Sequence, residues 1–134
     1  MRLLICGSRN WKHKDIVKHC IQYYLKDQIV DCIIEGEARG ADTFAREIAE
    51  ELSIPVLKFP AQWEKFGKAA GPIRNKQMLD EGKPTFVLAF HNDIKESKGT
   101  KNMIRISRKA GISGKLVGCI AKDKKSRGKV LEEW

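Results

Sequence analysis

The stretch that decides the fold is DCIIEGEARGADTFAREIAEEL, residues 31–52. It opens with a short apolar run, residues 31–34, of the kind found in strands that are buried on both faces. Gly36 and Gly40 interrupt the pattern, and apolar residues then recur over residues 41–52 at the three- and four-residue spacing of an amphipathic helix. The stretch therefore predicts a strand, a glycine-containing turn and a helix.

The same alternation of strand and helix patterns runs through most of the chain, without an internal repeat or a linker. Alternating elements predict one α/β domain in which a mainly parallel, five-stranded sheet is covered by helices on both faces, giving three layers. The other expected strands are 3–6, 55–59, 85–90 and 115–120, the other expected helices are 16–25, 72–82 and 100–110, and loops are expected over 61–71 and 91–98.

Length and composition favour a single folded unit. The chain has 134 residues, 42% of them hydrophobic, and only four prolines, which fits one domain with a proper core. We expect this domain to span residues 1–121 and a basic tail to span 122–134. No apolar run approaches the roughly 20 residues that cross a bilayer, and the apolar N-terminus is short for a signal peptide. We therefore expect a cytoplasmic protein without a membrane partner.

The charge balance is strongly basic. The sequence has 26 Lys and Arg against 17 Asp and Glu, a formal net charge of +9. Such a balance favours anionic partners: nucleotides, other phosphorylated small molecules or nucleic acid. For the basic tail, a merely solvated segment is the alternative.

Cysteines and histidines give little sign of a metal site. The four cysteines are far apart, without a C-x-x-C pair, and three of them fall in apolar runs. Buried, reduced thiols are expected from that pattern. The three histidines add no ligand spacing, so we expect neither a metal nor another cofactor.

The distinctive residues follow the expected strands. In an open parallel sheet, ligands bind beyond the carboxyl ends of the strands, where the strand order reverses. An order of 3-2-1-4-5 would bring three loops around one crevice: Gly7 to Arg9, residues 36–42 and residues 97–100.

The turn at residues 36–42 is neither a Walker A loop nor G-x-G-x-x-G. Its glycines would still let backbone N–H groups approach an anion at the start of a helix, and Arg39 could bind phosphate with two hydrogen bonds. Asp42, in the first turn of that helix, is a dipole partner, a cap or an acidic group. The alternative is that the turn is purely structural.

Residues 97–100 repeat this arrangement with two hydroxyls, a glycine and a helix start. The structural alternative is a Ser or Thr N-cap. Between the two turns, Arg74 and Asn75 lie on the first turns of a predicted helix, where the arginine faces either solvent or the crevice. Trp63 and Phe66 are candidates for stacking on a base, or for the apolar packing of a lid.

Together these segments resemble the SLOG superfamily, in its YspA/YpsA-related branch, relatives of the LOG phosphoribohydrolases and of DprA. The segments that carry the resemblance are GSR at 7–9, EGEARGADTFA at 35–45, FPAQWEKFGKAAGPIRNKQML at 59–79, AF at 89–90 and SKGTKNMI at 97–104. The resemblance implies a Rossmann-like fold that binds nucleotides or nucleotide-derived ligands of the ADP-ribose type. It also implies a homo-oligomer. Members of the superfamily either hydrolyse an N-glycosidic bond or sense such ligands.

Several positions match the motifs of LOG enzymes. Gly36, Arg39 and Gly40 resemble their first glycine-rich motif, and Gly99 and Thr100 resemble the G-T of P-G-G-x-G-T-x-x-E. Arg74 and Met78 resemble the R-K-x-x-M helix, with Asn75 in place of lysine.

Two positions depart from those motifs. Met103 stands where the final glutamate is expected, and a thioether can neither stabilise an oxocarbenium-like centre nor move a proton. Glu37 stands where a second glycine is expected. A carboxylate beside a phosphate costs electrostatic energy unless it binds a ribose hydroxyl or takes part in chemistry, so Glu37 and Arg74 form the speculative catalytic pair.

Three functions follow, in order of preference: a module that binds a ribose-phosphate ligand, a nucleotide N-glycosidase, and a nucleic-acid-binding protein. The predicted ligand-binding residues are Gly7, Ser8, Arg9, Gly36, Glu37, Arg39, Gly40, Asp42, Arg74, Asn75, Ser97, Gly99 and Thr100.

Overall fold

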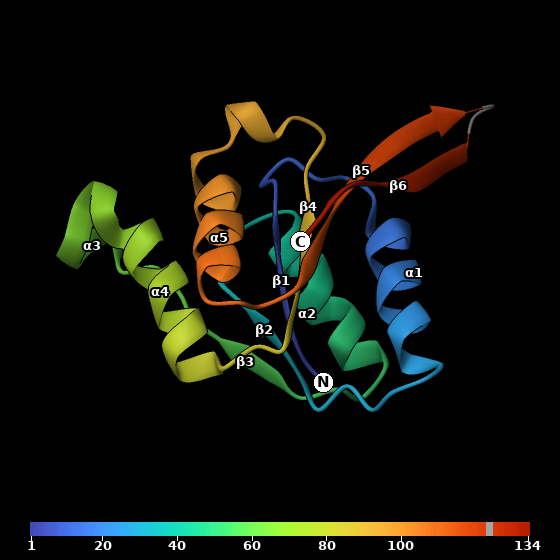
Figure 1. Ribbon diagram of the computed structural model, residues 1–134, viewed down its shortest axis with the longest axis horizontal. Coiled ribbons are helices and arrows are strands. Elements are labelled where there is room, and N and C mark those ends of the chain that lie inside the picture. Colours follow the sequence, from blue (N-terminus) through green and yellow to red (C-terminus); the bar gives the residue numbers. More distant parts are fainter. Residues whose placement is uncertain (123–124) are drawn as a thin grey trace.

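A computed structural model describes residues 1–122 and 125–134, and six strands in these residues form one sheet. The sheet order is β3-β2-β1-β4-β5-β6 (Figure 1). The strands are β1 (Arg2–Gly7), β2 (Cys32–Glu35), β3 (Val56–Lys58), β4 (Phe86–Phe90), β5 (Gly114–Lys122) and β6 (Lys125–Glu133).

The first five strands are parallel and follow the expected order. β1 and β4 occupy the centre, where the strand order reverses. Leu3 of β1 pairs with Phe86 of β4, and Gly7 at the end of β1 pairs with Phe90. The loops that leave these two strands therefore start side by side.

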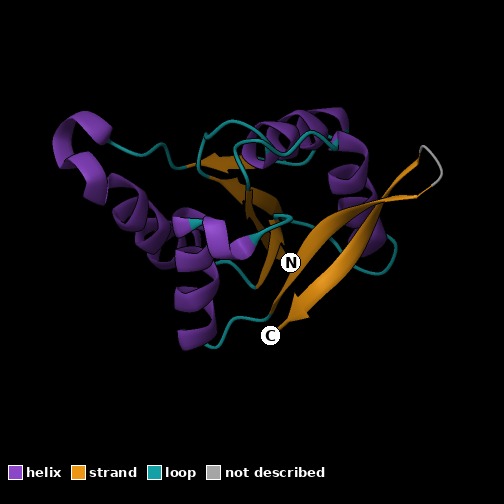
Figure 2. Ribbon diagram, turned by 90° about the horizontal axis from the view of Figure 1, so that it is seen from above, coloured by secondary structure: helices purple, strands orange, loops and turns teal. Residues whose placement is uncertain are grey.

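Helices cover the sheet on both faces, so the expected three layers are present (Figure 2). α1 and α2 pack on one face, and α4 and α5 pack on the other. The helices are α1 (Lys14–Leu25), α2 (Ala41–Glu51), α3 (Trp63–Phe66), α4 (Ala70–Gly82) and α5 (Lys98–Lys109), with short 3₁₀ turns η1 (Gly67–Ala69) and η2 (Ile94–Glu96).

Alternation along the strands divides the core between the two faces, because successive side chains of a strand point in opposite directions. Leu3 and Ile5 pack with α1 and α2, whereas Leu4 packs with Met78 of α4 and Met103 of α5. All five side chains are almost completely buried.

The expectation of five strands and a C-terminal tail is wrong for most of the tail. Residues 125–133 form β6, which runs antiparallel to β5 at the edge of the sheet. Trp134 continues this pairing through two backbone hydrogen bonds with Gly114, of 3.0 and 3.1 Å. Edge strands face solvent and tolerate charge. Because β6 is rich in lysine and arginine and lacks a clear apolar alternation, its sequence did not predict a strand.

The expected loops at 61–71 and 91–98 contain short helical segments. α3 and η1 lie in the first loop and η2 in the second, and α5 begins at Lys98, two residues earlier than predicted. Pro72 lies in the first turn of α4, as expected, where its missing N–H leaves no helical hydrogen bond unmade. The four cysteines are free thiols. Among the described residues, none of the helices is long and apolar enough to cross a membrane.

Candidate functional site

A cleft of about 580 Å³ opens at the carboxyl ends of β1 and β4, between the loop after β1 and the N-terminal parts of α4 and α5. Its position is the one expected for a ligand site in this class of fold. The lining residues are Cys6, Gly7, Ser8, Arg9, Asn10, Ala38, Asp42, Trp63, Lys68, Gly71, Pro72, Arg74, Asn75, Met78, His91, Glu96, Ser97, Lys98, Gly99 and Thr100.

A smaller cavity of about 290 Å³ adjoins this cleft and shares Arg9, Ala38, Trp63 and Arg74 with it. The Arg9 guanidinium lies 5.4 Å from the centre of the Trp63 ring, a cation–π arrangement in which these two side chains border both cavities. The residues lining the smaller cavity are Arg9, Gly36, Glu37, Ala38, Arg39, Pro60, Ala61, Trp63 and Arg74.

The structure thus divides the predicted site residues between two neighbouring cavities. Glu37, Arg39 and Gly36 line the smaller one, and Arg9 and Arg74 line both. Gly40 lines neither. The remaining predicted residues, Gly7, Ser8, Asp42, Asn75, Ser97, Gly99 and Thr100, line the larger cleft.

The backbone N–H groups of the turn after β2 already have carboxylate partners. Gly36 and Ala38 each donate a hydrogen bond of 3.2 Å to Oδ2 of Asp42, and Glu37 donates one of 2.6 Å to Oε2 of Glu35. Asp42 therefore ties the turn to the start of α2. The N–H groups that were predicted to bind an anionic ligand therefore bind the protein's own carboxylates. Hydrogen-bond donors for such a ligand have to come from elsewhere in the cleft.

Each glycine of this turn has a packing reason. Arg74 lies directly across Gly36, and a Cβ on that glycine would overlap the guanidinium group. Gly40 adopts a φ of 74°, in the left-handed region that favours glycine, and a Cβ there would overlap the carbonyl oxygen of Ser8. Both glycines therefore allow segments from different parts of the chain to approach closely.

Arg74 is fixed from two sides. Its Nη1 donates to the carbonyl oxygen of Gly36 at 2.5 Å, and its Nε donates to Oδ1 of Asn75 at 3.1 Å. Burial lowers the pKa of Arg74, and nearby Asp42 opposes this effect. Arginine titrates so far above neutrality that the group keeps its charge.

Asn75 connects α4 to the start of α5. Its Nδ2 donates to the carbonyl oxygen of Gly99 at 3.2 Å and to Oδ1 of Asn102 at 3.0 Å. Asn75 is only 4% exposed, so this amide positions Arg74 and the N-terminus of α5 relative to each other.

The segment from Ser97 to Thr100 forms a serine N-cap at the start of α5. Oγ of Ser97 accepts a hydrogen bond of 3.0 Å from the N–H of Thr100, so the structural alternative for this serine is confirmed. An added Cβ on Gly99 would meet nothing within 4 Å. The backbone at the beginning of α5 is therefore open to approach from the cleft.

The sequence is similar to that of known proteins. Residues 1–66 match the family described as the YspA, cpYpsA-related SLOG family. The chain is also 35% identical over 117 residues to the Gene 61 protein of Mycobacterium phage D29, which covers 83% of this chain and 91% of that protein. The chain belongs to the YspA, cpYpsA-related SLOG family. Membership suggests a nucleotide-related function.

Met103, which stands where LOG enzymes are expected to have their glutamate, lies in the core of this SLOG protein. Met103 is completely buried and packs with Leu4 and Val87 on the α4–α5 side of the sheet. It does not line the cleft. A methionine at this place contributes to packing, and a glutamate there would be buried without solvent.

Glu37 has a lysine of β3 as its charged neighbour. It adopts a φ of 54°, and its Oε1 lies 3.9 Å from Nζ of Lys58. Arg74 and Glu37 both line the smaller cavity.

Beneath the turn of this SLOG protein lies a carboxyl group, that of Glu35, which was not among the predicted site residues. Glu35 is completely buried, and its Oε1 lacks a hydrogen-bond partner among the described residues. Burial raises its pKa to about 7, the N–H of Glu37 opposes this, and Asp42 adds to it. Glu35 directly follows the apolar run at residues 31–34, and this position at the end of a buried strand was the available signal.

His91, Lys68 and Lys98 line the cleft but were not among the predicted residues. Burial lowers the pKa of His91, and its Nδ1 accepts a hydrogen bond of 2.9 Å from the N–H of Asp93. His91 directly follows β4, so its position after a central strand could have identified it. Lys68 lies in η1, within a segment expected to be a loop.

Cys6 lines the floor of the cleft. Burial and nearby Asp42 raise the pKa of its thiol, so it is a neutral group rather than a nucleophile. Within residues 1–122 and 125–134, no group of three or more His, Cys, Asp or Glu side chains is arranged to hold a metal ion.

Proposed function

We propose that the larger cleft binds a nucleotide or a nucleotide-derived ribose-phosphate ligand of the ADP-ribose type. The observation that carries the proposal is the convergence of Arg9, Lys68, Arg74 and Lys98 on one cleft that also contains the open N-terminus of α5. The cleft volume of about 580 Å³ falls within the range of small-molecule sites.

The phosphate subsite lies at the start of α5. The first N–H groups of a helix lack partners within the helix and carry partial positive charge, so they bind anions. Ser97 occupies the N–H of Thr100, which leaves the N–H groups of Lys98 and Gly99 at the open end. Arg74 and the Lys98 side chain add full positive charges on the same cleft.

The base subsite lies at Trp63. Its side chain is 48% exposed and borders the cleft, with Arg9 on one face of the ring. A purine ring can stack on an exposed indole. Phe66 lines neither cavity, so Trp63 is the better of the two aromatic candidates.

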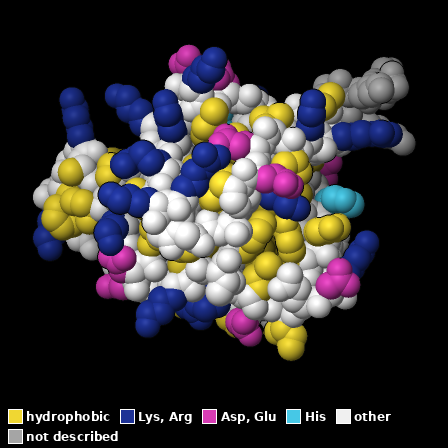
Figure 3. All heavy atoms as spheres, viewed as in Figure 1, with side chains coloured by type: hydrophobic (Ala, Val, Ile, Leu, Met, Phe, Trp, Pro, Cys, Tyr) yellow, Lys and Arg dark blue, Asp and Glu magenta, His cyan; other side chains and the backbone are white. Residues whose placement is uncertain are grey.

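The electrostatic surroundings support an anionic ligand. Figure 3 shows Lys and Arg side chains gathered over the part of the molecule that carries α3, α4 and α5. Two carboxylates, Asp42 and Glu96, line the same cleft. Asp42 is engaged with the turn after β2, which leaves Glu96 at the rim as a candidate partner for a ribose hydroxyl.

Isothermal titration calorimetry with ADP-ribose, AMP and NAD tests the proposal. Lys98→Ala should weaken binding about tenfold through loss of a charge-assisted contact. Lys101→Ala is the matched control, because Lys101 is an exposed lysine of the same helix outside the cleft; its affinity should stay within about twofold. Absence of heat with all three ligands contradicts the proposal.

The same preparation tests the two alternatives. Release of free base from AMP, abolished by Glu37→Gln, would support the N-glycosidase. Equal losses in Lys98→Ala and Lys101→Ala, with binding to single-stranded DNA that falls steeply with salt, would support nucleic-acid binding instead.

A further inference from the structure

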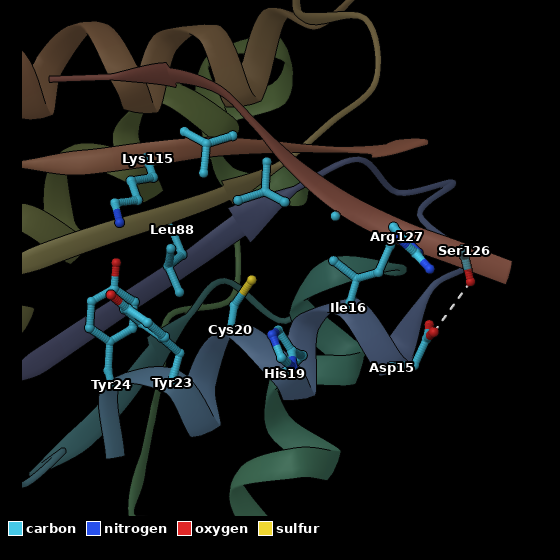
Figure 4. Close-up of a pocket in the computed structure, with 13 residues that line it drawn as sticks. Asp15, Ile16, His19, Cys20, Tyr23, Tyr24, Leu88, Lys115, Ser126 and Arg127 are labelled. Carbon is cyan, nitrogen blue, oxygen red and sulfur yellow. Dashed lines mark hydrogen bonds between the residues drawn. The ribbon is translucent and has the colours of Figure 1, made fainter. Parts of the chain in front are cut away.

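A third cavity, of about 650 Å³, lies between α1 and the β5–β6 hairpin, on the other face of the sheet from α4 and α5 (Figure 4). After β5 the chain turns back as β6 instead of forming another helix. The hairpin consequently meets α1 along its side, and a space remains between them. Among the described residues, none lines both this cavity and the larger cleft of the candidate site.

The middle of the cavity is mostly apolar, and the imidazole of His19 on α1 also lines it. Ile16 of α1, Leu88 of β4 and Val117 of β5 line it, and Val130 of β6 lines it as a 45% exposed side chain. Cys20 points into the same space in Figure 4. Burial raises the pKa of its thiol to about 11, so the thiol is neutral and adds to the apolar lining.

One end of the cavity is closed by direct contact between α1 and β6. Asp15 Oδ2 accepts a hydrogen bond of 3.2 Å from Oγ of Ser126 (Figure 4). Gly128 approaches Ile16 so closely that a Cβ on the glycine would lie 2.9 Å from Cγ2 of Ile16. The carboxylate at this end therefore already has a partner. Arg127 of β6 also lines this end, as an exposed side chain without a phenol beside it in Figure 4.

The other end carries a cation and two phenols. Nζ of Lys115 lies 5.7 Å from the ring centres of both Tyr23 and Tyr24. Burial raises the pKa of Tyr24, so the phenol remains protonated and can donate a hydrogen bond to an anion. Oε1 of Glu133 lies 3.8 Å from Nζ of Lys115, and the Glu133 side chain is 64% exposed. An anionic ligand can therefore replace Glu133 as the partner of Lys115, because the displaced carboxylate stays in solvent.

We propose that this cavity binds a small amphipathic organic acid, with its ring or short apolar chain over Leu88 and Val117 and its anionic group at Lys115, Tyr23 and Tyr24. The cation–phenol end provides charge complementarity, and the apolar middle excludes a polyphosphate. The proposed ligand thus differs in class from that of the nucleotide cleft, and the two proposals do not depend on each other.

Fluorescence titration with anilinonaphthalene sulfonate, an aromatic ring system with one anionic group, tests the proposal on the folded protein. We expect saturable binding to one site and a raised thermal midpoint, because a ligand of the native state stabilises it. Lys115→Met should weaken binding at least about tenfold. Lys129→Met, which removes the same charge from β6 outside the cavity, should change it less than about twofold.

Val130→Trp provides a second variant that places a large ring in the mouth of the cavity without emptying the core, and it should abolish binding. Excess AMP should leave the titration unchanged. Equal effects of Lys115→Met and Lys129→Met, a lowered thermal midpoint, displacement of the probe by AMP, or full binding to Val130→Trp would each overturn the proposal.

Discussion

At the scale of single residues, Glu35 beneath the turn after β2 makes the stability of the fold depend on pH. Its carboxyl group is completely buried, accepts the N–H of Glu37 and faces Asp42, with Nη1 of Arg46 at 3.9 Å. Burial raises its pKa to about 7 from the ordinary value of 4.5. The folded protein therefore holds a proton that the unfolded chain releases at lower pH.

This proton makes the free energy of unfolding fall as pH rises from about 4.5 through 7. The loss attributable to Glu35 is about 3 kcal/mol. Glu35→Gln keeps the volume and an acceptor oxygen but cannot ionise, so its stability should lack this decline. Urea unfolding of both proteins at pH 5, 6, 7 and 8 measures the difference, and parallel pH profiles would refute the assignment.

Gly36 and Gly99 differ in what surrounds them. A Cβ on Gly36 would overlap the Arg74 guanidinium, whereas a Cβ on Gly99 would meet nothing within 4 Å. We expect Gly36→Ala to cost about 2 kcal/mol of unfolding free energy. Gly99→Ala should be neutral or stabilise by up to about 1 kcal/mol, since alanine favours a helix more than glycine does. Chemical unfolding of the pair decides this, and equal costs would argue against the close approach of Arg74.

At the scale of elements, the start of α5 depends on its cap. Ser97 accepts the Thr100 N–H, so Ser97→Ala should destabilise the protein by about 1 kcal/mol. Ser113→Ala is the control, because Ser113 is an exposed serine outside the helices. Thermal unfolding should separate the two variants; an unchanged midpoint for Ser97→Ala would mean that the cap contributes little.

Strands and helices that bury apolar side chains could be predicted from the sequence pattern. Elements held by backbone pairing at an exposed edge, or too short to show a period, could not. β1, β2 and β4 are buried on both faces, and their short apolar runs identified them. β6 is held by backbone pairing with β5 at an exposed edge, which leaves little apolar signal. α3 is a single turn of four residues without a buried side chain, too short to show a helical period.

At the scale of the whole molecule, the predicted strand order brings most of the predicted site residues to one edge of the sheet, and the structure has them there. Connectivity alone brings the carboxyl ends of β1, β2 and β4 together. The division into two cavities depends on how Arg9 meets Trp63, a contact between distant segments. The use of the Gly36 and Ala38 N–H groups by Asp42 likewise depends on side-chain direction, which spacing does not give.

The measurement that tests the central claim most directly is a ¹⁵N–¹H NMR titration of the labelled protein with AMP and ADP-ribose. We predict that the backbone amides of Lys98 and Gly99 shift most, together with the indole N–H of Trp63, while those of Gly36 and Ala38 change little because they remain bound to Asp42. Large shifts at Gly36 and Ala38 with none at the start of α5, or no shifts near the cleft at all, would contradict a phosphate site at the N-terminus of α5.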